Sequence, residues 1–128
     1  MSVSKRSYRL GDLQLQIMKI LWDKHQASVS EIHQILSNTE LAYTTIATML
    51  RKMEVKGLVD HVVEGRSFLY RPLINENEVT QNMAEDVLNR VFEGSLADMV
   101  SHLLTRHEVS PGELERLEKL IQEKRKTK

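Results

Sequence analysis

The 128-residue sequence has no cysteine, and this absence excludes a disulfide framework and any metal site built on thiolates. It also has no run of about 18 apolar residues, so we expect neither a membrane-spanning helix nor membrane insertion. The N-terminus lacks the apolar core of a signal peptide. A cytoplasmic protein is therefore the default expectation.

Net charge is absent as well, because 18 lysines and arginines balance 18 aspartates and glutamates. That balance by itself argues against nucleic acid as a partner. The two halves differ, however: residues 1–73 hold 10 basic and 7 acidic side chains, whereas residues 74–128 hold 8 and 11. A basic half followed by an acidic half fits a binding module followed by an interaction module. We therefore expect two domains, residues 1–73 and 74–128.

The stretch from Ala42 to Gly57 predicts an amphipathic helix whose two faces differ in chemistry. Its apolar side chains recur at the spacing of a buried stripe, and Gly57 suits a left-handed helix end. The stripe consists of Ile46, Met49, Leu50 and Met53. The opposite face carries threonines and cations: Thr44, Thr45, Thr48, Arg51 and Lys52. Threonine is a mediocre helix former, but its hydroxyl and methyl groups can contact base edges while Arg and Lys contact phosphates. Taken alone, this face fits DNA reading and plain solvation equally well.

The rest of the first half predicts the elements of a winged helix-turn-helix. One helix runs from a cap at Asp12 to about Lys24, and a second, capped by Ser30, buries Ile32, Ile35 and Leu36. After the third helix, residues 58–63 and 68–72 read as strands joined by a turn over residues 64–67. Arg66 lies in that turn, where it is placed either against phosphate or the minor groove or simply in solvent.

The second half predicts three amphipathic helices, begun by a cap at Asn75, a break at residues 94–95 and a cap at Ser110. Three such helices would be marginal alone, so we expect two copies to cover each other's apolar faces. The side chains assigned to this dimerisation are Val87, Leu88, Val91, Phe92, Leu96, Met99, Val100, Leu103, Leu104, Leu114, Leu117 and Ile121. A twofold dimer would also double a short recognition surface and read a palindrome. The fold class is thus mainly α with a small β-hairpin wing, a winged helix-turn-helix followed by an all-helical dimerisation region.

Five stretches of the chain resemble the penicillinase repressor family (BlaI/MecI-type). They are residues 15–22 (LQIMKILW), 43–58 (YTTIATMLRKMEVKGL), 64–73 (EGRSFLYRPL), 92–100 (FEGSLADMV) and 110–114 (SPGEL). Members of that family are winged-helix dimers that repress β-lactamase and methicillin-resistance genes in bacteria. The resemblance covers nearly the whole chain.

The resemblance implies a homodimeric transcriptional repressor that binds an inverted-repeat operator in double-stranded DNA, with no metal or cofactor. It assigns base reading to Thr45 and Thr48. Backbone or flanking contacts then fall to Tyr43, Thr44, Arg51, Lys52 and Arg66. The chain departs from the family at Thr44, where a lysine is frequent, and at Ala47, where a longer polar residue can occur.

The resemblance also implies a means of derepression. Some members are inactivated by a membrane-bound sensor metalloprotease that cuts within the dimerisation helix. The corresponding bond here is His102–Leu103, where cleaved members resemble Asn-Phe. Proteolytic derepression is therefore an expectation that this substitution weakens.

Other classes of function have less support in the residues. Asp98, Ser101 and His102 are close in sequence, but Ser101 would point about 100° away from His102 on a helix, so no catalytic triad is expected. The histidines include no pair at the i, i+4 spacing of a helical metal site. The main alternative is a winged-helix protein-interaction module on a dimeric helical scaffold. Such a module would expose aromatic or aliphatic anchors where this chain has threonines and cations.

Overall fold

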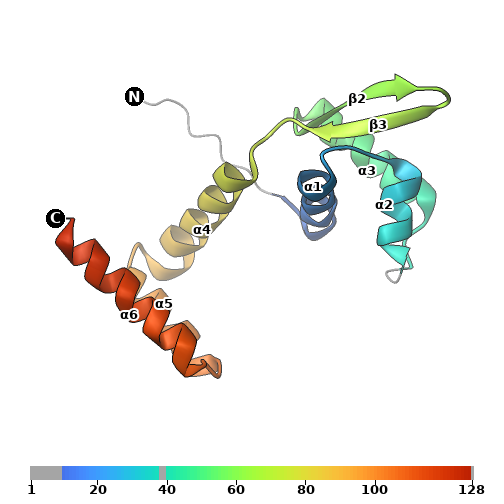
Figure 1. Ribbon diagram of the computed structural model, residues 1–128. Coiled ribbons are helices and arrows are strands. Elements are labelled where there is room, and N and C mark those ends of the chain that lie inside the picture. The colour runs from blue at the N-terminus through green and yellow to red at the C-terminus, as the bar shows by residue number, and fades with distance from the viewer. Residues whose placement is uncertain (1–9, 38–39, 128) are drawn as a thin grey trace. The chain divides into compact units, whose positions relative to one another are not determined.

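The computed structural model describes residues 10–37 and 40–127. Its elements are α1 (Asp12–Lys24), β1 (Ala27–Ser28), α2 (Val29–Ile35), α3 (Tyr43–Val55), β2 (Val59–Glu64), β3 (Ser67–Pro72), α4 (Glu76–Phe92), α5 (Leu96–Arg106) and α6 (Pro111–Lys126) (Figure 1). The predicted class, mainly helical with a small antiparallel sheet, is confirmed. No helix in the described ranges combines the length and apolarity that crossing a bilayer requires.

The described residues form two compact units that divide between Ala84 and Glu85. The first two turns of α4 belong to the first unit because Val79, only 1% exposed, lies in its core. The predicted boundary between a DNA-binding domain, residues 1–73, and a dimerisation domain, residues 74–128, lies eleven residues before this division. The two predicted domains and their roles stay a prediction.

The first unit has a closed apolar core in which α1, α2 and α3 pack with the sheet. Its buried apolar residues are Ile17, Met18, Leu21, Ala27, Ile32, Leu36, Ile46, Leu50, Met53, Leu58, Val59, Tyr70, Ile74 and Val79. Helix α1 contributes the fully buried side chains of Ile17, Met18 and Leu21 to this core. The indole of Trp22 donates a 2.9 Å hydrogen bond to the carbonyl oxygen of Ile74, which fastens the chain after the sheet to α1.

Three local predictions in this unit are wrong. Gly11, not Asp12, precedes the first turn of α1, and its N–H donates to Oε1 of Gln14 at 3.1 Å. Helix α2 begins earlier than expected because Ser28, not Ser30, is its cap: Ser28 Oγ accepts the N–H of Glu31, whose carboxylate accepts the N–H of Ser28. Ile35, expected to be buried, is 49% exposed because α2 ends there and turns its last side chain outward.

The sheet has three antiparallel strands in the order β1-β3-β2. The hairpin of β2 and β3 follows the prediction, with Val59 opposite Pro72 and Glu64 opposite Ser67. Its turn is tighter than expected, since only Gly65 and Arg66 lie between the strands and Gly65 adopts a φ of +62°. The short strand β1 was not predicted; it pairs Ala27 with Tyr70 and holds the start of α2 against the hairpin.

The second unit consists of the end of α4 with α5 and α6. Helix α5 is capped by Ser95, whose Oγ accepts the N–H of Asp98, and α6 by Ser110, whose Oγ accepts the N–H of Glu113. Helix α4 begins with a cap too, because Asn75 Oδ1 accepts backbone N–H groups at 2.8 and 3.2 Å. No described residue from Glu85 onward is buried. The predicted amphipathic helices are present, and the side chains of their apolar stripes are half-buried or exposed in a single chain.

Candidate nucleic-acid interface

The outward face of α3 carries the side chains that the sequence assigned to DNA. Thr44, Thr45 and Thr48 are exposed, and so are Arg51 and Lys52. The opposite stripe is closed, because Ile46, Leu50 and Met53 are fully buried and Met49 is partly buried. The predicted orientation of the helix is confirmed. The assignment of individual side chains to bases or phosphates stays a prediction.

Two of these side chains contact each other. Nη2 of Arg51 donates to Oγ1 of Thr48 over 3.3 Å, one turn apart on the helix surface. The guanidinium is thereby held over the side of α3 that Thr48 occupies. A cation fixed beside a threonine can contact phosphate while the threonine hydroxyl faces a base edge.

The hairpin is joined to α3 by a side-chain cluster around His61 of β2. Nδ1 of His61 lies 2.8 Å from Oε1 of Glu54 on α3. The His61 ring stacks on Phe68 of β3, with centroids 4.1 Å apart and planes 16° from parallel, and it lies 5.4 Å from the ring of Tyr70. These contacts set where the hairpin lies beside the recognition-type helix (Figure 1).

A second cross-strand contact stiffens the base of the hairpin. Arg71 donates from Nε and Nη2 to the two carboxylate oxygens of Asp60 at 3.0 and 2.9 Å, and the two residues are directly opposite in the ladder. The hydrogen bond and charge of Arg71 hold the pKa of Asp60 below its ordinary value of 3.8. Arg71 is thus engaged by Asp60, whereas Arg66 at the turn makes no ion pair with any residue that the structure describes.

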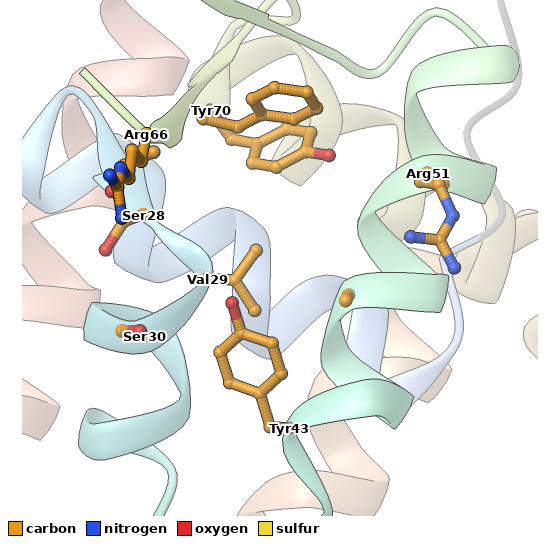
Figure 2. Close-up of a pocket in the computed structure, with 10 residues that line it drawn as sticks. Ser28, Val29, Ser30, Tyr43, Arg51, Arg66 and Tyr70 are labelled. Carbon is orange, nitrogen blue, oxygen red and sulfur yellow. The ribbon is translucent and has the colours of Figure 1, made fainter. Parts of the chain in front are cut away.

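A cavity of about 320 Å³ opens between the start of α2, the face of α3 and the hairpin (Figure 2). Its lining consists of Ser28, Val29, Ser30, Tyr43, Ala47, Arg51, Arg66, Ser67, Phe68 and Tyr70. Three predicted contact residues, Tyr43, Arg51 and Arg66, therefore share one concave site. Thr44, Thr45, Thr48 and Lys52 do not line it.

Tyr43 stands at the junction of α2 and α3. Its ring makes an edge contact with His33 of α2 at a centroid distance of 6.0 Å, and His33 Nε2 lies 2.9 Å from the carbonyl oxygen of Leu41. The phenol is 47% exposed, so it is anchored at one edge and open at the other. Burial raises the pKa of Tyr70, the other tyrosine of the cavity, whose ring is covered.

Sequence reasoning missed the contribution of α2 to this site. Ser28, Val29 and Ser30 enter the lining because β1 pins them beside the hairpin. The only signal in the sequence was the Ser-x-x-Glu pattern from Ser28 to Glu31, which marks the true start of α2.

Sites of other kinds receive no support within the described ranges. No group of three or more histidine, aspartate or glutamate side chains there could hold a metal ion. In the second unit the ring of His102 lies 5.9 Å from that of Phe92. No hydrogen bond joins His102 to Asp98 or Ser101 among the residues that the structure describes.

Comparison with known proteins shows which family and which fold the chain resembles. The sequence model of the penicillinase repressor family matches residues 10–123. The chain is 31% identical over 125 residues to the penicillinase repressor of Bacillus licheniformis, covering 97% of this chain and 98% of that protein. It is 32% identical over 101 residues to the transcriptional regulator BlaI of Mycobacterium tuberculosis, covering 77% and 73%. Among solved structures, the DNA-binding domain of the repressor BlaI superposes with a TM-score of 0.50 at 34% identity, covering 59% of this chain and 93% of that domain.

Proposed function

Because the chain belongs to the penicillinase repressor family, we propose that it is a DNA-binding transcriptional repressor that acts as a homodimer on an inverted-repeat operator in the bacterial cytoplasm. Members of this family are transcriptional repressors rather than enzymes. The observation that carries the proposal is the exposed face of α3 with Thr45, Thr48 and Arg51, set beside a hairpin whose turn presents Arg66.

Within this function the side chains of α3 divide by chemistry. Thr45 and Thr48 present a hydroxyl and a methyl group, which suit base edges and thymine methyls in the major groove. Arg51 and Lys52, with Tyr43 and Thr44 at the start of the helix, contact the backbone and fix the register. Arg66 contacts the backbone from the hairpin.

Selection of bound duplexes from random DNA tests the function directly. We expect an enriched palindrome, since two copies related by a twofold axis read two half-sites. Val55 on α3 and Val63 on β2 are 88% and 64% exposed, and such apolar side chains could instead anchor a protein. Absence of any enriched sequence would contradict the repressor and favour a protein-interaction module.

Substitution of the threonines tests the assignment of base readers. Thr45→Ala and Thr48→Ala should each weaken binding to the selected duplex by about 1–3 kcal/mol while leaving non-specific binding nearly unchanged. Thr80→Ala, an exposed threonine on α4, is the matched control. An equal loss on specific and random duplexes would remove that threonine from the list of base readers.

The second unit supplies the dimer in this proposal. Val91, Leu96 and Ile121 expose 65%, 63% and 54% of their surface in a single chain. Leu96, Val100, Leu104 and Ile121 also line an open apolar groove between α5 and α6. Exposed leucines and valines at this density favour association with a second copy of the same surface. Sedimentation of the full chain should give a dimer whose dissociation follows mass action.

We further propose that a membrane-bound sensor metalloprotease relieves repression by cutting the His102–Leu103 bond. Both residues are exposed and lie within α5, in the unit assigned to dimerisation. A cut there would divide the apolar face that Leu96 and Leu104 share. Mass spectrometry of the protein from cells exposed to a β-lactam should find a fragment that begins at Leu103. Derepression with the chain intact would contradict this mode of control.

A further inference from the structure

We propose that Glu54 and His61 are positioning residues for DNA binding. Their contact holds the outer part of the hairpin (residues 63–68) against α3, so that Arg66 in the turn and the exposed face of α3 meet the DNA together. The inference rests on the proposed function, in which Arg66 contacts DNA from the hairpin. It adds two residues that act through Arg66 rather than by touching DNA.

The outer part of the hairpin needs such a hold. Strand β1 pairs with Tyr70 and Leu69 of β3, so residues 63–68 lie beyond the third strand of the sheet (Figure 1). A ribbon of two strands without further packing is only marginally stable in water. Arg66 is exposed at the end of this ribbon. Its position relative to α3 therefore depends on side chains that join the ribbon to the helix.

His61 is the side chain that makes this join. Its Nδ1 lies 2.8 Å from Oε1 of Glu54 on α3, and its ring stacks on Phe68 with centroids 4.1 Å apart. His61 is opposite Tyr70 in the ladder, so the stack on Phe68 is a diagonal contact that reaches towards the turn. One ring thus joins the helix to the outer part of the hairpin, two residues from Arg66.

The contact between Glu54 and His61 is directional and partly shielded from solvent. A carboxylate can only accept a hydrogen bond, so Nδ1 of His61 carries the proton and donates it. The side chains of His61 and Glu54 are 26% and 34% exposed, so water and salt screen this pair less than a fully exposed one. The carbonyl oxygen of Glu54 also accepts the N–H of Gly57, whose φ is +82° where the chain turns from α3 towards β2. Glu54 therefore helps to set both the start and the middle of the path into the hairpin.

The test is a double-mutant cycle on binding of the selected duplex by the full-length protein. Arg66→Ala should weaken binding several-fold in the otherwise unchanged chain. His61→Phe keeps an aromatic ring for the stack but removes the donor to Glu54, and it should itself weaken binding about two- to tenfold. In the His61→Phe chain, Arg66→Ala should weaken binding little further, because the turn no longer holds Arg66 at the DNA.

Two control substitutions distinguish positioning from a general loss of structure. Thr48→Ala removes a side chain of α3, so its cost should be the same with and without His61→Phe. Val62→Ala is the matched control on the strand, because Val62 follows His61 but its side chain points to the other face of the sheet. It should leave the cost of Arg66→Ala unchanged. A merely structural contact would lower stability, measured by denaturant titration of each variant, and leave the costs of Arg66→Ala and Thr48→Ala as they were.

Glu54→Ala separates the hold from the charge of the carboxylate. Removing an acid near DNA should by itself tighten binding on every duplex. Breaking the hold should instead reduce the cost of Arg66→Ala, as His61→Phe does. We expect this reduced cost whatever the change in overall affinity, and an unreduced cost would contradict the positioning role.

The remaining outcomes separate the two proposals. If the costs of His61→Phe and Arg66→Ala add in full, or if Arg66→Ala costs nothing in the unchanged chain, the positioning role is wrong. The repressor function then stands, because the duplex is still bound. If the unchanged protein selects no duplex from random DNA, the repressor function itself fails and the positioning role fails with it.

Discussion

The two units of the chain contain helices of similar amphipathic pattern, but only one unit covers its apolar side chains. Every described apolar residue that is buried lies at or before Val79, whereas α5 and α6 bury none. The sheet accounts for the difference. In the first unit β3 lies across α1 and closes the core, while the second unit has helices alone. We therefore expect the first unit to fold by itself and the second to use its apolar surface for a partner.

Separating the units should give the largest effect. Residues 1–84 alone should unfold cooperatively as a monomer and bind operator weakly, whereas residues 85–128 alone should lose most of their helicity on dilution. A fragment ending at Leu73 should be less stable than residues 1–84 by about 1.5–3 kcal/mol for each of the buried side chains Ile74 and Val79, and it also lacks the carbonyl oxygen that accepts the hydrogen bond from Trp22. Circular dichroism with sedimentation measures all three. If the 85–128 fragment kept its helicity at every protein concentration, the second unit would fold alone as the first does, and the contrast between the units would be wrong.

Matched leucine substitutions should have an intermediate effect. In the first unit the substitution should lower the stability of the fold, and in the second it should weaken dimerisation. Leu50→Ala removes a fully buried side chain and should lower the free energy of unfolding by about 2–5 kcal/mol at any protein concentration. Leu103 is 45% exposed, so Leu103→Ala should chiefly weaken dimerisation, and its cost should disappear at dilutions where the protein is monomeric. Denaturant titrations at several concentrations test both. A cost for Leu103→Ala that persists in the monomer would mean that the second unit has a core of its own.

The smallest effect concerns the pair of Asp60 and Arg71 on the hairpin. Because the pKa of Asp60 is held below 3.8 in the folded chain, the pair contributes stability above that pH and loses it as the pH falls through the lowered value. Arg71→Gln should move the pKa of Asp60 back up towards 3.8 and leave stability near neutral pH little changed. NMR titration of the Asp60 carboxyl group measures the shift. An unmoved pKa would assign its depression to some other group.

Helices and their caps could be predicted where the pattern that indicates them, an apolar repeat or a capping motif, is contained in a few neighbouring residues. The stripe of Ile46, Leu50 and Met53 follows from the 3.6-residue repeat, and Ser110 caps α6 as its Ser-Pro-x-Glu pattern indicates. The start of α2 was placed wrongly because Ser28 and Ser30 are both acceptable caps locally. The choice depends on the pairing of β1 with β3, which joins segments about forty residues apart.

Only the part of the candidate site that lies on a single helix could be predicted from the sequence. The exposed face of α3 follows from sequence, but the cavity combines side chains from α2, α3 and β3 that only tertiary packing brings together. The same holds for the contact between Glu54 and His61, whose distance depends on where the chain turns between α3 and β2. A histidine inside a run of β-branched residues gives no local sign of such a contact.

The indole of Trp22, hydrogen-bonded to the carbonyl oxygen of Ile74, provides an intrinsic fluorescence probe of the protein. Trp22 is the only tryptophan, and all three tyrosines also precede Glu85. Intrinsic fluorescence therefore reports on the first unit alone, while far-UV circular dichroism sums the helices of both. The emission of Trp22 should change when the segment after β3 detaches from α1. It should stay unchanged when α5 and α6 unfold, dissociate or are cut. Recording both signals on one unlabelled sample thus resolves which unit a ligand, a protease or dilution has altered.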